Sequence, residues 1–190
     1  LPSWPLSASA EGVFLSNLIG SVGTETFEST PAEPAAPLPV TFVGSGVVAT
    51  LSGDGYVSAV TPGLSNGFGR YAISGAHYWE SSSDFSIQFS EPVAAFGFYG
   101  VDIGDFNGQV TLTLENGGTV ELVIPNTTNG LGGSVIFFGF VDTEQSYTAI
   151  TLGNTAPGAD FFGFDDMTIA TGAEVLTGAC CLEAFQCMVV

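Results

Sequence analysis

The chain has 190 residues, 45% of them hydrophobic and 16 of them phenylalanine, so it can bury the core of one large domain. Almost all of its charged residues are acidic: it has 19 Asp and Glu residues and a single Lys or Arg residue, Arg70, so the net charge is −18. Such a surface repels polyphosphate and anionic lipid, which excludes nucleic acid as a partner and disfavours a membrane surface. It favours cations instead, above all calcium. No apolar run is long enough for a membrane-spanning helix, so we expect no membrane insertion.

The chain divides into three predicted parts: an extended N-terminal arm over residues 1–11, a β-sandwich domain over 12–172 and a cysteine-containing tail over 173–190. Prolines favour an extended backbone in the arm, and the run 13–19 fits either a strand or a helical turn. The arm carries three apolar residues that suit docking on another surface: Leu1, Trp4 and Leu6.

Short strands are predicted along the middle of the chain, with no convincing helix. A proline-rich surface crossover is expected over residues 31–39, since proline cannot donate to a sheet ladder. The expected strands cover residues 24–29, 40–43, 46–52, 56–60, 70–73, 85–90, 93–101, 109–115, 119–124, 135–141, 147–153 and 161–170. This pattern predicts an all-β fold, a two-sheet antiparallel β-sandwich of jelly-roll type with extended terminal arms.

The stretch 85–106 organises the pattern, because it contains an alternating strand, an unbroken apolar run and a tight acidic turn. A Phe-Gly-Phe sequence lies in this apolar run and recurs at 138–140 and 162–164. A glycine inside a strand either lets a large ring lie over the backbone or marks a bulge. The clearest hairpin joins 109–115 to 119–124, where Asn116-Gly117 suits a primed turn.

The order and spacing of these runs are similar to those of a known group of domains. The sequences TETFES, FSIQFSEPVAAFGFYGVDIGDF, VIFFGFVD, ITLGN and FFGFDDMTI, within residues 24–170, resemble the extracellular β-sandwich domains of bacterial PEP-CTERM-sorted surface proteins. The sequence TGACCLEAFQC resembles the GACC-type cysteine motif near the ends of some secreted bacterial proteins. The resemblance implies a sandwich fold and a location at the bacterial cell surface, and it does not imply an enzyme.

Acidic residues near both ends of the sandwich suggest a structural calcium site. The pair Phe27-Glu28 and the sequence Phe164-Asp165-Asp166 resemble the calcium site of jelly-roll carbohydrate-binding modules, where an early acid and a last-strand acid meet. Neighbouring residues of a strand point to opposite faces, so only one of the two aspartates is expected to be a ligand. The alternative is that both aspartates simply end a strand at the surface.

A second oxygen-rich turn contains Asp102, Asp105 and Asn107. It is a further candidate for calcium, but it lacks the glycine and the distal glutamate of an EF-hand loop. A plain Asx-turn is therefore the favoured interpretation.

Two neighbouring aromatic residues, Tyr78 and Trp79, suggest a platform on which a sugar stacks, although two aromatics near a strand end are also ordinary core. Catalysis has weaker support. Residues 63–67 match the G-x-S-x-G pattern of a hydrolase, but no strand clearly leads into them and no helix is expected after them, and the only histidine, His77, comes without an intervening acid. A plain turn is expected there, and we predict no catalytic residue.

The three cysteines, Cys180, Cys181 and Cys187, cluster in the tail and favour an oxidising extracellular compartment. An odd count leaves one thiol free or bonded to another chain, unless a fourth cysteine follows Val190. Both interpretations stay open.

These observations favour a non-catalytic structural protein of the bacterial extracellular surface. The leading hypothesis is a subunit that assembles with copies of itself into a fibre or layer, with a terminal arm adding a strand to a neighbour's sheet. The alternative is a carbohydrate-binding or adhesion module that contacts a surface polysaccharide through Tyr78 and Trp79, in a fold braced by calcium.

Overall fold

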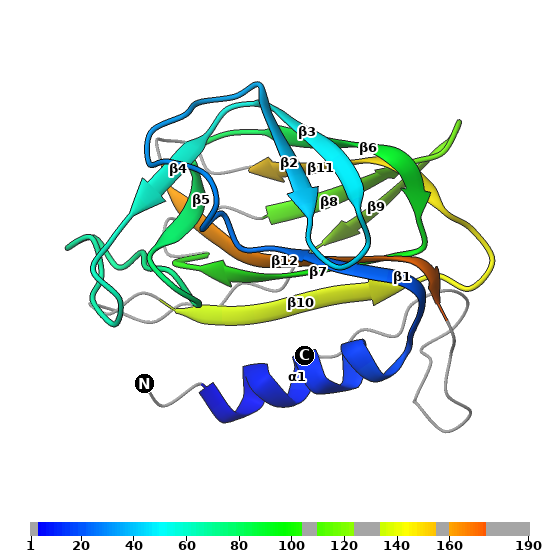
Figure 1. Cartoon of the computed structure of the whole chain (residues 1–190), viewed down its shortest axis with the longest axis horizontal. Helices are drawn as coiled ribbons and strands as arrows, with labels where there is room; N and C mark the ends of the chain where they lie inside the picture. The colour runs from blue at the N-terminus through cyan, green and yellow to red at the C-terminus, as the bar shows by residue number, and fades with distance from the viewer. Residues whose placement is uncertain (1–3, 104–109, 124–133, 155–159, 174–190) are drawn as a thin grey trace.

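The computed structural model describes residues 4–103, 110–123, 134–154 and 160–173, and these form a β-sandwich with one helix packed against it (Figure 1). Two six-stranded antiparallel sheets face each other, which confirms the predicted fold class. Sheet A contains β1 (Leu18–Glu25), β4 (Tyr56–Ala59), β5 (His77–Ser81), β7 (Ala95–Val101), β10 (Val135–Val141) and β12 (Phe162–Ala173). Sheet B contains β2 (Leu38–Phe42), β3 (Val47–Gly53), β6 (Phe85–Val93), β8 (Val110–Glu115), β9 (Thr119–Val123) and β11 (Tyr147–Asn154).

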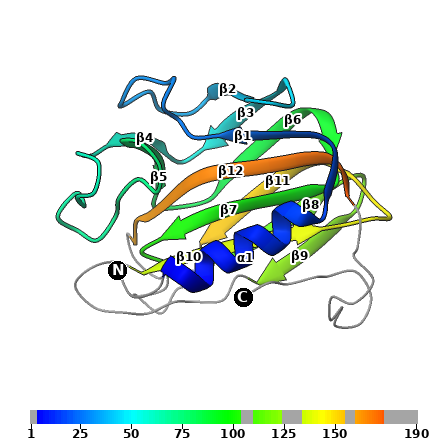
Figure 2. The same cartoon turned by 60° about the horizontal axis from the view of Figure 1, so that its bottom comes forward.

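The strand order shows how each sheet is built. Sheet A runs β10-β7-β12-β5-β4, and β1 pairs with the second half of β12. Sheet B runs β2-β3-β6-β11-β8-β9. Pro39 lies in β2, which is an edge strand, so its missing N–H costs no ladder bond. The helix α1 (Trp4–Ser16) lies across the outer face of sheet A beside β10, as Figure 2 shows.

The Phe-Gly-Phe sequences explain the core. Their phenylalanines are buried between the sheets in β7, β10 and β12, where ring pairs such as Phe98–Phe164 lie 5.5 Å apart. Gly97 of β7 and Gly139 of β10 are direct cross-strand partners. A Cβ on Gly97 or Gly139 would come within 2.9 Å or 2.7 Å of the Phe14 ring of α1. The glycines therefore let a large ring lie over the backbone, as the sequence predicted.

The predicted extended arm is wrong, because most of it belongs to α1. Pro5 occupies the second position of this helix, where its missing N–H would have no intrahelical partner in any case. Alanine, serine and leucine then continue the helix without a breaker until Gly12. Phe14 is buried on sheet A, and this packing supplies the stability that a short isolated helix lacks.

The structure also tests three other local expectations, for residues 13–19, residues 70–73 and the hairpin of β8 and β9. The run 13–19 is the end of α1 followed by the start of β1, so the first strand begins at Leu18 and not at residue 24. Residues 70–73 form no strand and belong to a loop. The hairpin of β8 and β9 is confirmed, but Glu115 pairs with Thr119 across a three-residue loop in which Gly117 alone has a positive φ, +101°.

We expect Gly139→Ala to destabilise the protein by about 1–3 kcal/mol, because the added methyl group displaces the Phe14 ring from the sheet. Urea unfolding measures this loss. The matched control is Gly118→Ala, since a Cβ there meets nothing within 4 Å, and its change should stay within about 0.5 kcal/mol. Equal stability of the two variants would show that α1 does not depend on this contact.

Candidate functional site

The longest described connection in the sandwich joins β4 to β5 over residues 60–76 and lies at one end of the molecule. Its two ends are tied together by the Val60 N–H, which donates to the Ala76 carbonyl at 2.9 Å. Connections longer than about 12–15 residues with no secondary structure of their own are often functional. We call residues 60–76 the β4–β5 loop and treat it as the candidate site.

Asn66 organises the first half of the β4–β5 loop. Its Oδ1 accepts the backbone N–H groups of Phe68 at 2.9 Å and Arg70 at 3.3 Å, and its own N–H donates to the Arg70 carbonyl at 2.9 Å. These bonds close residues 66–70 into a compact ring. Residues 63–67, which match G-x-S-x-G, form a turn as predicted, and Ser65 Oγ accepts the Gly67 N–H at 3.3 Å.

Arg70, the only basic residue of the chain, anchors this ring to the sandwich. Its Nε lies 3.4 Å from Glu80 Oε1, and its Nη1 lies 3.3 Å from Asp102 Oδ2. Nη1 also donates to the Phe161 carbonyl at 3.3 Å, and the guanidinium carbon lies 5.4 Å from the Phe161 ring centroid. The Arg70 side chain is only 12% exposed, so the charge is held inside a nearly dry network.

Glu80 completes the network from β5. Its carboxylate accepts the hydroxyl protons of Tyr56 at 2.9 Å and Tyr78 at 2.8 Å. Burial and the contact with Glu80 raise the pKa of Tyr56 to about 12 and raise that of Tyr78 as well. Both hydroxyls therefore stay protonated donors at neutral pH. The predicted sugar platform is wrong, because Tyr78 and Trp79 are both fully buried, and the ordinary-core alternative is confirmed.

The second half of the β4–β5 loop is fixed by two aspartates of β12. Asp165 Oδ2 accepts the N–H groups of Ile73 at 2.7 Å and Ser74 at 3.1 Å. Asp166 Oδ1 accepts the Ser74 hydroxyl proton at 2.6 Å. Asp165 is fully buried, and burial together with the neighbouring Asp166 raises its pKa to about 8, against the opposing effect of three backbone N–H donors.

Glu28 holds the end of the same loop. Its Oε1 accepts the N–H groups of Ala76 at 2.8 Å and His77 at 2.6 Å. The turn that aims Glu28 at the loop comes from Phe27, which is fully buried with a φ of +60°. Glu25 stabilises this unusual backbone, because its Oε1 accepts the Phe27 N–H at 2.5 Å.

Glu28, Asp165 and Asp166, the predicted calcium ligands, all contact the β4–β5 loop or the residue that follows it. There they accept hydrogen bonds from backbone N–H groups and from the Ser74 hydroxyl. Asp102 pairs with Arg70, and its predicted partners Asp105 and Asn107 lie outside the described residues. Among the described residues, no group of three or more His, Cys, Asp or Glu side chains is placed to hold a metal ion. Calcium binding stays a prediction.

The other predicted residues are placed only in part. Asp105, Leu1, Cys180, Cys181 and Cys187 lie outside the described residues, and Trp4 and Leu6 lie in the first turns of α1.

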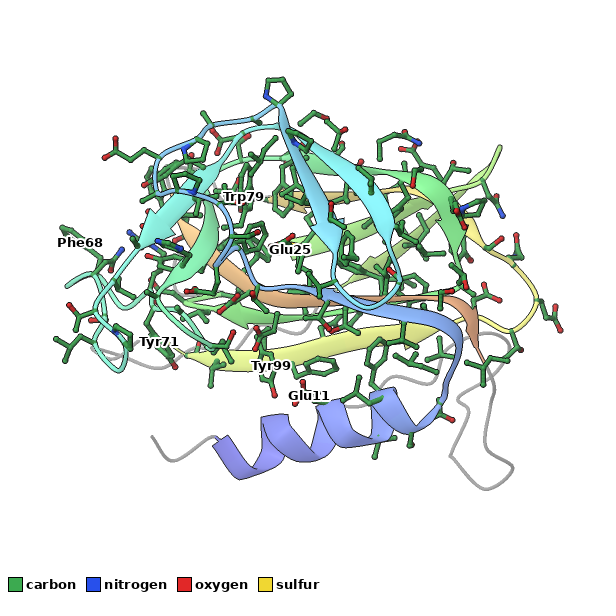
Figure 3. The ribbon with its side chains drawn as sticks, viewed as in Figure 1. Glu11, Glu25, Phe68, Tyr71, Trp79 and Tyr99 are labelled. Carbon is green, nitrogen blue, oxygen red and sulfur yellow. The ribbon has the colours of Figure 1, made fainter. Side chains whose placement is uncertain are left out.

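Above this anchored base, the tip of the β4–β5 loop carries two apolar side chains in water. Phe68 is 77% exposed and points away from the sandwich (Figure 3), and Leu64 is also exposed. Ser65 and Thr61 of the same loop are exposed as well. The loop therefore presents an exposed aromatic ring and exposed hydroxyl side chains on a base fixed by hydrogen bonds and ion pairs, which is the composition of a binding surface. Sequence reasoning missed Phe68, although a lone aromatic among turn residues, SNGFGR, was a usable signal.

Comparison with known proteins yields similarity to solved structures alone, because no family model and no curated protein matches. A cleaved adhesin domain of Lys-gingipain aligns with 80% of this chain and 98% of its own, at 16% identity and a TM-score of 0.48. A cyclase from Fischerella sp. TAU aligns with 80% and 96%, at 12% identity and 0.47. A mutant family 29 carbohydrate-binding module in complex with mannohexaose aligns with 82% and 94%, at 12% identity and 0.39. At these values none of the three assigns a ligand or an activity to this chain.

Among the described residues, no helix has the length and apolar character needed to cross a membrane.

We expect Arg70→Met to lower the free energy of unfolding by about 3–5 kcal/mol, because it leaves the buried carboxylates of Glu80 and Asp102 without their cation. Urea unfolding measures the loss. Adding Glu80→Gln to the Arg70→Met variant should recover part of it, since one unpaired charge is removed. A loss below about 1 kcal/mol in the single variant would contradict the anchoring role.

Stability should rise as the pH falls from about 8 toward 4. The pKa of Asp165 is higher in the folded protein than in the unfolded chain, so folding favours its protonated form, and the stabilisation is lost as the pH rises through the folded pKa. One such group changes the free energy of unfolding by at most about 1.4 kcal/mol per pH unit. Urea unfolding at pH 5 to 9 and constant ionic strength tests this, and Asp165→Asn should flatten the slope. An unchanged slope in that variant would assign the dependence to other groups.

Proposed function

We propose that the chain is a non-catalytic module that attaches to a neutral polysaccharide at an extracellular surface, with Phe68 at the centre of its contact. The observation that carries this proposal is an exposed aromatic side chain on a loop that is otherwise fixed to the sandwich. Leaving a phenylalanine in water forfeits on the order of 1.5–3 kcal/mol of burial energy. The Arg70 guanidinium, whose carbon lies 5.9 Å from the Phe68 ring centroid, offsets this loss only in part.

The rigidity of the β4–β5 loop supports a binding role. Phe68 lies between Asn66 and Arg70, whose backbones are bonded to each other and whose side chains reach the buried network. A contact residue held in one position loses little conformational entropy when a ligand binds. The backbone that carries the Phe68 ring is therefore already fixed before a ligand binds.

The chemistry around Phe68 favours a carbohydrate. A sugar ring has an apolar face that stacks on an aromatic side chain and a rim of hydroxyl groups that suits exposed hydroxyl side chains of the same loop, such as Ser65 and Thr61. The charge favours a neutral sugar, because the single cation, Arg70, is already neutralised by Glu80 and Asp102 and the chain carries a net charge of −18. Anionic polymers would be repelled.

The assembly hypothesis has less support than the binding hypothesis. Its extended arm is helical over residues 4–11, and its disulfide residues lie outside the described part of the chain. Self-assembly into a fibre therefore stays a hypothesis without a structural contact to carry it, whereas the exposed Phe68 gives the binding hypothesis a specific residue to test.

We expect Phe68→Ala to weaken binding to a neutral polysaccharide by at least about tenfold, since the stacking surface is removed. Affinity electrophoresis through gels containing galactan, mannan, xylan or β-glucan measures retention. The matched control is Val43→Ala, because Val43 is 73% exposed on a different turn and should leave retention unchanged. Retention of the parent should also persist in 0.5 M salt, because no charge pair is involved. Equal retention of parent and Phe68→Ala, or no retention of the parent in any gel, would overturn the proposal.

A further inference from the structure

The sequence has an asparagine directly before a glycine at four places, residues 66–67, 107–108, 116–117 and 129–130, and the structure describes the first and the third. Asparagine is a chemically labile residue, and it is most labile before glycine, because glycine has no side chain to hinder its own backbone nitrogen. Asn66-Gly67 lies in the β4–β5 loop, and Asn116-Gly117 lies in the loop between β8 and β9. The surroundings of the two sequences differ, and this difference decides which asparagine reacts.

The reaction, deamidation, needs two groups of the same chain to meet. The backbone nitrogen of the glycine attacks Cγ of the asparagine, and the new C–N bond closes a succinimide ring. The Cγ–Nδ2 bond breaks, and the amide leaves as ammonia with the proton of the glycine nitrogen. Water then opens the ring at either of its carbonyl carbons, which leaves an aspartate or an isoaspartate. The glycine N–H and the asparagine amide must therefore both be able to move.

Asn66 is held out of this geometry by hydrogen bonds. Its Oδ1 accepts two backbone N–H groups of the ring of residues 66–70, and its Nδ2 donates to the Tyr78 hydroxyl at 3.3 Å. The N–H of Gly67, which would have to attack, donates to Ser65 Oγ at 3.3 Å. The attacking nitrogen and the amide are thus both engaged, and the reaction requires the loop to open first.

Asn116 lies in open surroundings. Asn116, Gly117 and Gly118 are all exposed, and a Cβ on either glycine would meet nothing within 4 Å. Nδ2 of Asn116 donates to Oε1 of Gln145 at 2.9 Å, but both side chains are exposed, so water replaces this bond at little cost. The backbone bond from the Asn116 N–H to the Gly118 carbonyl is long, at 3.4 Å. This loop therefore adopts the reactive geometry without breaking a buried contact.

We infer that Asn116 is a site of spontaneous deamidation in the folded protein, whereas Asn66 is protected by the hydrogen bonds of the β4–β5 loop. The inference does not depend on the proposed function. Deamidation adds a negative charge to the hairpin, and an isoaspartate also lengthens its main chain by one carbon, which weakens the pairing of Glu115 with Thr119. Figure 1 shows the hairpin loop at the end of the sandwich opposite the β4–β5 loop, so the surroundings of Phe68 stay as they are.

The two rates can be measured in one molecule. The full chain is incubated at mildly alkaline pH, digested with chymotrypsin and mapped by mass spectrometry, which gives the deamidated fraction at each asparagine over time. We expect residue 116 to react at least about tenfold faster than residue 66, a difference of about 1.4 kcal/mol in activation free energy. In urea that unfolds the chain, the two rates should agree within about threefold, because the protecting bonds are gone. No reaction at residue 116 in the folded chain, equal rates there, or a ratio that is unchanged in urea would overturn the inference.

A variant in the β4–β5 loop tests the protection of Asn66. Ser65→Ala removes the acceptor of the Gly67 N–H, and Ser65 is exposed, so the fold is retained. Residue 66 of this variant should react at least about threefold faster than in the parent, with the rate at residue 116 unchanged. Thr61→Ala is the matched control, because it removes an exposed hydroxyl group from the same loop, and it should behave like the parent. The same rate at residue 66 in Ser65→Ala and in the parent would contradict protection by this hydrogen bond.

Discussion

One cation determines how the candidate site is held. Arg70 is the only basic residue in a chain with 19 acidic ones, and the structure places it between Glu80 and Asp102 inside the protein, away from the repelling surface. Two carboxylates and two tyrosine hydroxyls depend on it for a stable buried arrangement. The β4–β5 loop is fixed because its ring of residues closes on the same arginine. An exposed arginine would have gained little from such pairs.

The fold followed from the sequence because its signals are local and repeated. Alternation over residues 85–90 and the three Phe-Gly-Phe sequences require strands with one face in a core, and the glycines require a ring on the other face. The identity of that ring, Phe14, could not be predicted, since it lies more than 80 residues away in the chain. The helix was missed because proline suits both an extended arm and a first helical turn.

The site was harder to predict than the fold. Sequence reasoning grouped Glu28 with Asp165 and Asp166 as calcium ligands, and in the structure these carboxylates accept hydrogen bonds from backbone N–H groups and a serine hydroxyl near one loop, which no side-chain pattern reveals. It named Tyr78 and Trp79 as a candidate platform and did not consider Phe68, because exposure depends on tertiary packing that the sequence does not reveal. Single residues such as Arg70 give no pattern at all, and only the folded chain shows which carboxylates they neutralise.

The position of β12 has a consequence for how the protein forms. This strand lies in the middle of sheet A, between β7 on one side and β5 and β1 on the other, although residues 162–173 come last among the described strands. During synthesis, sheet A therefore lacks its central strand until residues 162–173 have been made. Until then, the edges of β7 and β1 that pair with β12 in the folded protein have no partner strand. Such free edges favour pairing with other chains. Such distant pairing also makes folding slow, so the time before β12 inserts is the period in which this molecule most needs protection.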